Sequence, residues 1–165
     1  MDEFELIKKY FQKLSKNNPS ALKLNDDVFF DKKNKIVLSV DTYNEGIHYL
    51  NFKRPELVIK KIIRSSISDL ICKGVKPKYI LFSGSGNKKH FNKRNLILIS
   101  KSIAEEQRKY NIMLSGGDTT ASKISSFTIV SLGLSKKIIK RNNVKKDDDI
   151  YVTGNLGDSY IGLNI

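Results

Sequence analysis

The sequence of 165 residues contains no tryptophan, three prolines and a single cysteine, Cys72. One cysteine cannot form a disulfide within the chain, which is typical of proteins from a reducing compartment. No apolar run approaches the roughly 20 residues that a membrane-spanning helix needs. The first residues, Met1 to Glu5, are acidic and lack the basic start and apolar centre of a signal peptide. We therefore expect a cytoplasmic protein.

Acidic residues are scarce beside basic ones: 17 Asp and Glu stand against 30 Lys and Arg, a formal net charge of +13. This excess raises a nucleic-acid-binding module as one hypothesis. However, the lysines come as scattered pairs such as Lys32-Lys33 and Lys88-Lys89, without a basic stripe, interleaved aromatics or a nucleic-acid motif. This distribution favours a solvated lysine-rich surface, which would also attract a phosphate-bearing ligand.

The length allows one domain with a real core. Apolar residues at helical spacing predict helices over Phe4–Leu14, from Pro55 to Lys73-Gly74, and over Asn95–Tyr110. Runs rich in β-branched residues predict strands at Ile36–Val40, Lys78–Ser83, Ile112–Leu114, Ser126–Leu134 and Ile150–Val152. We interpret Gly84–Lys89 as a flexible connection because it lacks the full phosphate-loop signature.

The strand Ser126–Leu134 is apolar on both faces. Phe127 and Ile129 point one way, whereas Val130, Leu132 and Leu134 point the other way. The helices can cover one of these faces. We expect a second copy of the sheet to cover the other, which gives a homodimer joined through its sheets.

The stretch from Ser115 to Thr120 combines two glycines, Asp118 and two threonines after an apolar run. Glycines let a phosphate or a metal ion approach the backbone, and a carboxylate is a hard ligand for a divalent cation. A hairpin turn is the alternative interpretation. The ligand-binding interpretation of this stretch is favoured because three other aspartates also lie at or near the ends of apolar elements: Asp27, Asp41 and Asp69.

Each of these three has an alternative explanation. Asp27 suits a turn, and Asp41, directly after a buried strand, suits a cap as well as a metal site. Asp69 lies late in a helix, where a carboxylate opposes the helix dipole; this indicates a compensating cation, but one exposed turn of helix would also explain it. Four carboxylates converging at one sheet edge would repel each other unless cations held them. Oxygen ligands without histidine or cysteine select magnesium, which typically receives phosphates. The residues therefore indicate a magnesium–nucleotide site and phosphoryl transfer.

The order of these segments resembles a known family, thiamine-monophosphate kinase, in the superfamily of aminoimidazole ribonucleotide synthetase and selenophosphate synthetase. The resemblance spans nearly the whole chain. It depends on the motifs Asn25-Asp26-Asp27, Ser39-Val40-Asp41-Thr42, Glu45-Gly46-Ile47-His48, Ser68-Asp69-Leu70, Gly116-Gly117-Asp118-Thr119-Thr120, Val152-Thr153-Gly154 and Gly157-Asp158-Ser159.

The resemblance implies an α+β fold, in which helices pack on one face of a mixed sheet and the other face pairs with a second subunit's sheet. It implies direct, magnesium-dependent transfer of the ATP γ-phosphoryl group to thiamine monophosphate, with no phosphoenzyme and no protein nucleophile. Several Mg²⁺ ions and a homodimer belong to this expectation. The residues implied are metal ligands Asp27, Ser39, Asp41, Asp69 and Asp118; ATP contacts Gly117, Asp118 and Arg141; and a substrate contact, His48.

We expect residues 1–150 to form the N-terminal ATP- and magnesium-binding and dimerisation domain, and residues 151–165, with a helix opening at Asp158, to begin a C-terminal domain. A chain of this extent is expected to be incomplete as an enzyme. The alternatives are another ATP-dependent member of the same superfamily, a basic nucleic-acid-binding module, and an inactive dimerisation module.

Overall fold

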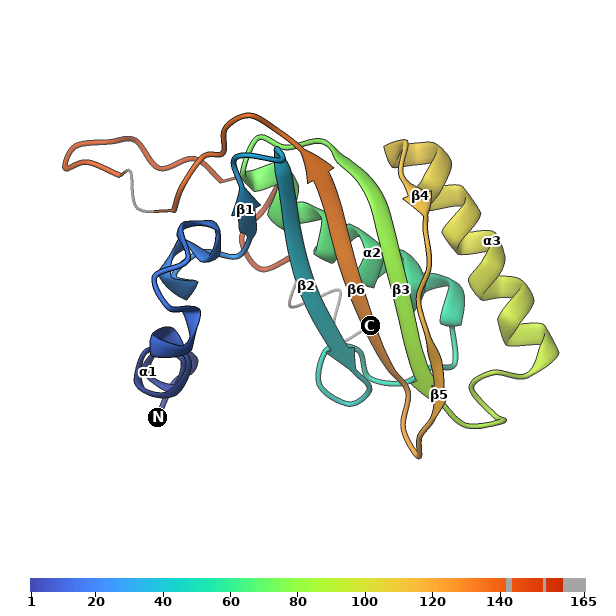
Figure 1. Ribbon diagram of the computed structural model, residues 1–165. Coiled ribbons are helices and arrows are strands. Elements are labelled where there is room, and N and C mark those ends of the chain that lie inside the picture. Colours follow the sequence, from blue (N-terminus) through green and yellow to red (C-terminus); the bar gives the residue numbers. More distant parts are fainter. Residues whose placement is uncertain (142–143, 153, 159–165) are drawn as a thin grey trace.

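The computed structural model describes residues 1–141, 144–152 and 154–158. It contains one six-stranded sheet in the order β1-β2-β6-β3-β4, with β5 also paired to β3. Two long helices, α2 and α3, lie behind the sheet in Figure 1 and leave its front open. The strands are β1 (Phe29–Asp31), β2 (Ile36–Asn44), β3 (Pro77–Gly86), β4 (Met113–Leu114), β5 (Thr119–Ala121) and β6 (Ser126–Leu134), and the long helices are α2 (Pro55–Cys72) and α3 (Lys93–Tyr110).

The sheet mixes both kinds of strand pairing. β6 is antiparallel to β2 on one side and to β3 on the other, whereas β4 and β5 are parallel to β3. The predicted α+β class, a mixed sheet with helices on one face, is thereby confirmed. In the ranges that the structure describes, no helix is long and apolar enough to cross a membrane.

The core lies between the sheet and α2. Helical spacing brings Ile59, Ile62 and Ile63 of α2 onto Phe127 and Ile129 of β6, and all five side chains are almost completely buried. Burial of an isoleucine or phenylalanine side chain contributes about 1.5–3 kcal/mol. This contact holds β6 against α2. Because β2 is paired with β6, the contact also sets the position of β2 relative to α2.

The open face of the sheet is apolar. Val130 and Leu132 of β6 are half-buried there, and Leu134 is exposed, as are Val40 of β2 and Leu81 of β3. The prediction that β6 has two apolar faces is correct. Its second face has no cover within the described chain.

Three strand predictions need correction. β2 continues to Asn44 because Thr42 and Tyr43 stay paired with β6, so Asp41 lies within the strand and not after it. β3 continues to Gly86, because Gly84 has no side chain to collide with the Phe127 ring and the strand can pass close to it. The predicted strand Ile150–Val152 is wrong: these residues are exposed and pair with no strand.

The first residues are helical, as predicted, but in three short pieces: α1 (Glu3–Leu6), a π-helical turn η1 (Ile7–Phe11) and a 3₁₀ turn η2 (Gln12–Ser15). A further 3₁₀ segment, η3 (Pro19–Leu24), leads to β1, a short strand that the sequence pattern did not predict. Figure 1 shows this N-terminal segment beside β1, away from α2 and α3. The helix predicted to open at Asp158 falls mainly outside the described residues.

Candidate active site

A cavity of about 260 Å³ lies where the N-terminal segment meets β2 and the end of α2. Its walls come from segments far apart in the sequence, and four of its lining residues are aspartates. The lining residues are Glu3, Phe4, Ile7, Leu24, Asn25, Asp26, Asp27, Val40, Asp41, Asp69 and Arg141. We refer to this cavity as the acidic pocket.

Strand alternation explains the orientation of Asp41. Val37, Ser39 and Tyr43 of β2 are buried against the helices, so Asp41 on the same face also points toward α2. Its Oδ2 atom is buried and has no hydrogen-bond partner. Burial raises the pKa of the Asp41 carboxyl to about 6, and the neighbouring charge of Asp69 adds to the shift. Hydrogen bonding from Ser66 and Tyr43 opposes the rise in the pKa of Asp41. A buried carboxylate oxygen without a partner is nevertheless unfavourable unless a cation or a proton compensates it.

Asp69, in the last turn of α2, faces the same strand. The Ser39 hydroxyl donates a hydrogen bond to Asp69 Oδ2 at 2.8 Å. The pKa of Asp69 is raised, mainly by burial and also by the charge of Asp27, although the hydrogen bond from Ser39 opposes the rise. The predicted proximity of Asp27, Asp41 and Asp69 at one pocket is therefore present in the structure.

Asp26 and Asp27 lie in the loop before β1 and have different surroundings. The Asp26 side chain is 6% exposed, whereas that of Asp27 is 38% exposed. Lys73 Nζ lies 2.5 Å from Asp26 Oδ1 and 3.6 Å from Asp27 Oδ2. Arg141 pairs with Asp27 through its guanidinium group, and its backbone N–H donates to Asp26 Oδ2 at 3.4 Å.

Asp118 does not join this group within one chain. It follows Gly117 in the link between β4 and β5, both of which pair with β3. Asp41 and the Gly117 segment are level across the sheet, because Asp41 pairs with Ile129, Ile129 pairs with Phe82, and Phe82 N–H donates to Gly116. Three strand spacings separate them, roughly 14 Å. The expectation that all four aspartates converge at one edge is therefore wrong for a single chain.

The glycine stretch is not the hairpin of the alternative interpretation, since β4 and β5 run in the same direction. Its backbone continues an edge strand: Phe82 N–H donates to Gly116 O at 2.9 Å, and Gly84 N–H donates to Asp118 O at 2.9 Å. Gly117 has φ +152°, and a Cβ at this position would lie 1.8 Å from Phe82 O. Asp118 itself is exposed and accepts a hydrogen bond from Thr119 N–H.

As they stand, no three His, Cys, Asp or Glu side chains in the described ranges form a group that could hold one metal ion. Arg141 and Lys73 both lie against Asp27, and their positive charges balance its negative charge. The donor chemistry nevertheless fits magnesium: the pocket offers hard carboxylate oxygens, and Asp41 Oδ2 has no other partner.

His48 lies in the turn after β2 and makes local contacts. Its Nδ1 accepts a hydrogen bond from Asn44 N–H at 3.0 Å, its carbonyl accepts one from Lys61, and its ring meets Tyr43 edge-on. These contacts give His48 a structural role, and its contact with a substrate stays a prediction.

Sequence reasoning missed three contributors to the acidic pocket: Asp26 as an anchor, Lys73 as its partner, and Phe4 as part of the wall. Phe4 lies 6.0 Å from the Arg141 guanidinium carbon. The apolar spacing of the first helix and the adjacent carboxylates were visible in the sequence. Only a long-range contact could connect them with Lys73 at the far end of α2.

Comparison with known proteins identifies the family. The model for AIRS, AIR synthase related protein, N-terminal domain, matches residues 23–135. The chain belongs to this family. Thiamine-monophosphate kinase of Buchnera aphidicola subsp. Schizaphis graminum (strain Sg) is 35% identical over 169 residues, which cover 99% of this chain and 52% of that protein. Thiamine-monophosphate kinase of Haemophilus influenzae (strain ATCC 51907 / DSM 11121 / KW20 / Rd) is 32% identical, over 99% of this chain and 51% of that protein.

Solved structures support the fold of this AIR synthase related domain. One described as "AaThiL complexed with AMPPCP and TMP" superposes with a TM-score of 0.75 at 23% identity, over 87% of this chain and 45% of that chain. Thiamine monophosphate kinase from Aquifex aeolicus gives a TM-score of 0.74, also at 23% identity, over 87% and 46%. The chain spans about half the length of the curated relatives it matches.

Proposed function

We propose that this chain is the nucleotide-binding half of a thiamine-monophosphate kinase, which transfers the γ-phosphoryl group of ATP directly to thiamine monophosphate. Two findings support this: the relatives carry that name, and a structure with the same fold is described with AMPPCP and TMP. The observation that carries the proposal for this chain is the buried Asp41 Oδ2, which has no partner although Asp69 and Asp27 line the same pocket.

In this proposal Asp27, Asp41 and Asp69 would hold magnesium, with Ser39 orienting Asp69. The metal would neutralise the phosphates, since an anionic acceptor must approach an anionic phosphoryl group. Arg141 faces the same pocket and would contact ATP. No side chain is needed as a nucleophile, because alignment and charge neutralisation carry this reaction.

Asp118 and Gly117 would enter the site from a second subunit. Their own chain holds them about three strand spacings from Asp41, which is too far for a shared ion. The apolar open face of the sheet, with Val40, Leu81 and Leu134 exposed, is a suitable surface for a homodimer. His48 remains a proposed substrate contact. The domain assignment, residues 1–150 followed by the start of a second domain, and the cytoplasmic location also stay predictions.

Thermal melts with ATP test the central claim. We expect ATP to raise the melting temperature only when Mg²⁺ is present, and Asp41→Asn to abolish that shift. Asp147→Asn, at an exposed position outside the pocket, is the matched control and should respond like the wild type. An equal shift for Asp41→Asn would reject the role of the acidic pocket.

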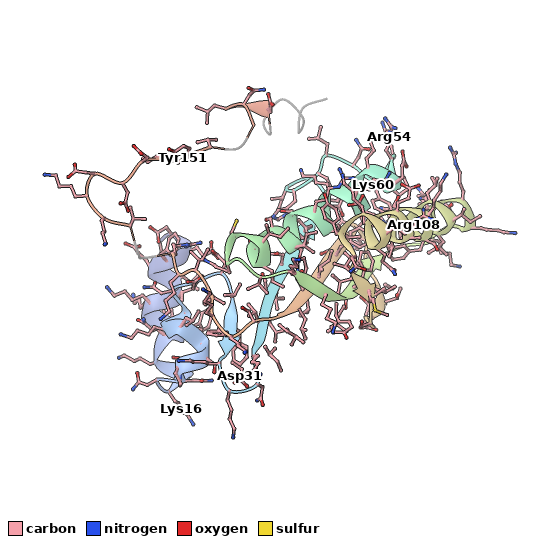
Figure 2. The ribbon with its side chains drawn as sticks, turned by 90° about the horizontal axis from the view of Figure 1, so that it is seen from above. Lys16, Asp31, Arg54, Lys60, Arg108 and Tyr151 are labelled. Atoms are coloured by element: carbon pink, nitrogen blue, oxygen red, sulfur yellow. The ribbon has the colours of Figure 1, made fainter. Side chains whose placement is uncertain are left out.

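The remaining candidates give different results in the same assay. Another superfamily member would gain more from a purine-precursor phosphate than from thiamine monophosphate. A nucleic-acid-binding module would bind DNA or RNA with an affinity that falls steeply with salt and ignores magnesium. Figure 2 shows Lys16 and Arg54 at opposite ends of the molecule, so these basic side chains share no surface. An inactive dimerisation module would show no ATP-linked shift at any magnesium concentration.

A further inference from the structure

Lys73 is a lysine whose ammonium group lies inside the protein. It forms the C-cap of α2, and its side chain is 6% exposed. Lysines are almost never buried to this degree without a charged partner. Its partner is Asp26, which is buried to the same extent, at a distance of 2.5 Å. The pair lies directly behind the wall of the acidic pocket, since Asp26 lines the pocket.

Every oxygen of Asp26 has a partner. Oδ1 accepts from Lys73 and from Asp27 N–H at 2.9 Å, and Oδ2 accepts from Arg141 N–H. Asp26 is therefore more fully engaged than Asp27, whose oxygens meet only the side chains of Arg141 and Lys73 and whose side chain is 38% exposed. The role of Asp26 is to hold the loop, and the loop in turn sets the direction of Asp27, the more exposed carboxylate of the two.

Lys73 also acts on Asp27 by charge. Its Nζ lies 3.6 Å from Asp27 Oδ2, which is within ion-pair distance. At this separation a positive charge lowers the cost of two adjacent carboxylates and also repels a divalent cation that approaches the same oxygen. Lys73 thus has two effects: it stabilises the metal-free pocket, and it lowers the affinity of the pocket for a divalent cation.

We propose that Lys73 is a positioning residue that serves as a resident cation of the acidic pocket: it anchors Asp26, which holds the loop that carries Asp27, and its charge lowers the affinity of the pocket for a divalent cation. This inference rests on the proposed function and concerns a residue that acts through Asp26 and Asp27 without contacting substrate. It assigns the aspartate pair two roles, with Asp26 as the anchor and Asp27 as the ligand.

The first test needs no metal. Melting temperatures are compared for the wild type, Lys73→Met, Asp26→Asn and the double variant. We expect Lys73→Met to lower the melting temperature and Asp26→Asn to lower it in the wild-type background but to raise it beside Lys73→Met, because the unpaired buried charge is then removed. If Asp26→Asn has the same effect in both backgrounds, the anchoring role is wrong.

The second test uses Mn²⁺ alone as the probe, followed by electron paramagnetic resonance. We expect Lys73→Met, or the double variant if the single one is unfolded, to bind Mn²⁺ at least about three-fold more tightly than the wild type. Lys73→Arg keeps the charge and should behave like the wild type. Lys76→Met removes an exposed lysine directly before β3 and should also behave like the wild type. A purely structural ion pair would leave Mn²⁺ affinity unchanged or weaken it, and either result overturns the resident-cation role.

The two failures are distinguishable. If the wild type binds Mn²⁺ and Lys73→Met binds it no more tightly, the resident-cation role is rejected and the proposed function stands. If neither protein binds Mn²⁺, both the magnesium site and the role of Lys73 toward it are rejected.

Discussion

Ser39 and Asp69 are 30 residues apart, and the Ser39 hydroxyl donates a hydrogen bond to Asp69 Oδ2 at 2.8 Å. This bond joins β2 to the last turn of α2 and so holds together the two elements that supply Asp41 and Asp69. It also occupies an oxygen of Asp69 and limits how that carboxylate can turn toward a ligand.

Ser39→Ala removes this bond. We expect a loss of about 1 kcal/mol in unfolding free energy and a weaker Mg²⁺-dependent ATP shift in a thermal melt. Ser102→Ala, which removes the bond from a buried serine of α3 to Glu56 O, is the control and should lower stability without changing the ATP response. A normal ATP response in Ser39→Ala would exclude Ser39 from the site.

The raised pKa of Asp41 predicts how stability depends on pH. Because its folded-state pKa is about 6 and the ordinary value is 3.8, the folded chain binds this proton more tightly than the unfolded chain. The contribution of Asp41 to the free energy of unfolding should therefore be largest below about pH 4. It should fall as pH rises from about 4 to about 6, by about 1–2 kcal/mol after allowance for partial solvent screening.

Denaturant unfolding of the metal-free chain at several pH values measures this fall. Asp41→Asn should flatten the curve in that window, with a residual slope from Asp69, whose pKa is also raised by burial. Mg²⁺ should restore stability above pH 6 in the wild type. An unchanged curve in Asp41→Asn would place the responsible group elsewhere.

Asp118→Asn tests whether the glycine stretch contributes to the site. We expect the variant to fold with near-normal stability because Asp118 is exposed, yet to lose the ATP-dependent rise in melting temperature. Mixing it with Asp41→Asn should restore part of that rise if the subunits exchange, because one site of the mixed dimer then has both wild-type aspartates. An undiminished ATP shift in Asp118→Asn alone would reject its role.

Gly117→Ala should be severely destabilising, by about 3 kcal/mol or more. The added carbon would lie 1.8 Å from Phe82 O, a backbone atom that cannot move aside. Gly46→Ala is a matched comparison, since a Cβ there meets nothing within 4 Å and only its φ of +81° is unfavourable. That variant should lose about 1 kcal/mol. Circular dichroism melts measure both, and equal losses would contradict the close approach.

Leu81→Lys tests the open face of the sheet. We expect the wild type to sediment as a dimer and the variant to dissociate at least about ten-fold more readily, because a charge would be buried in the interface. Ile97→Lys changes an exposed apolar residue of α3, on the opposite side of the sheet, and should leave the sedimentation profile unchanged. A monomeric wild type would contradict the dimer.

The sequence was informative where local patterns decide the structure. The limits of α2 follow from Pro55 and the spacing of its isoleucines, and the two faces of β6 follow from strand alternation. The proximity of Asp41 and Asp69 could also be anticipated, because each belongs to an element that must pack on the other. These predictions need no knowledge of how distant strands are ordered.

The position of Asp118 could not be predicted in this way. It depends on the order of strands across the sheet, and β6, the last strand among the described residues, inserts between β2 and β3. Lys73 was likewise invisible, because a lysine at a helix end normally reaches solvent. Its partner Asp26 lies 47 residues earlier in a loop, and no local pattern connects the two.

The N-terminal helical segment has a practical consequence for anyone who prepares this protein. Glu3 and Phe4 form part of the pocket wall, and Phe4 lies against the side chain of Arg141. A purification tag fused before Met1 would therefore be attached only two residues from the cavity. Weak nucleotide binding by such a fusion would report on the tag as much as on the aspartates, so binding should be measured after the tag has been cleaved.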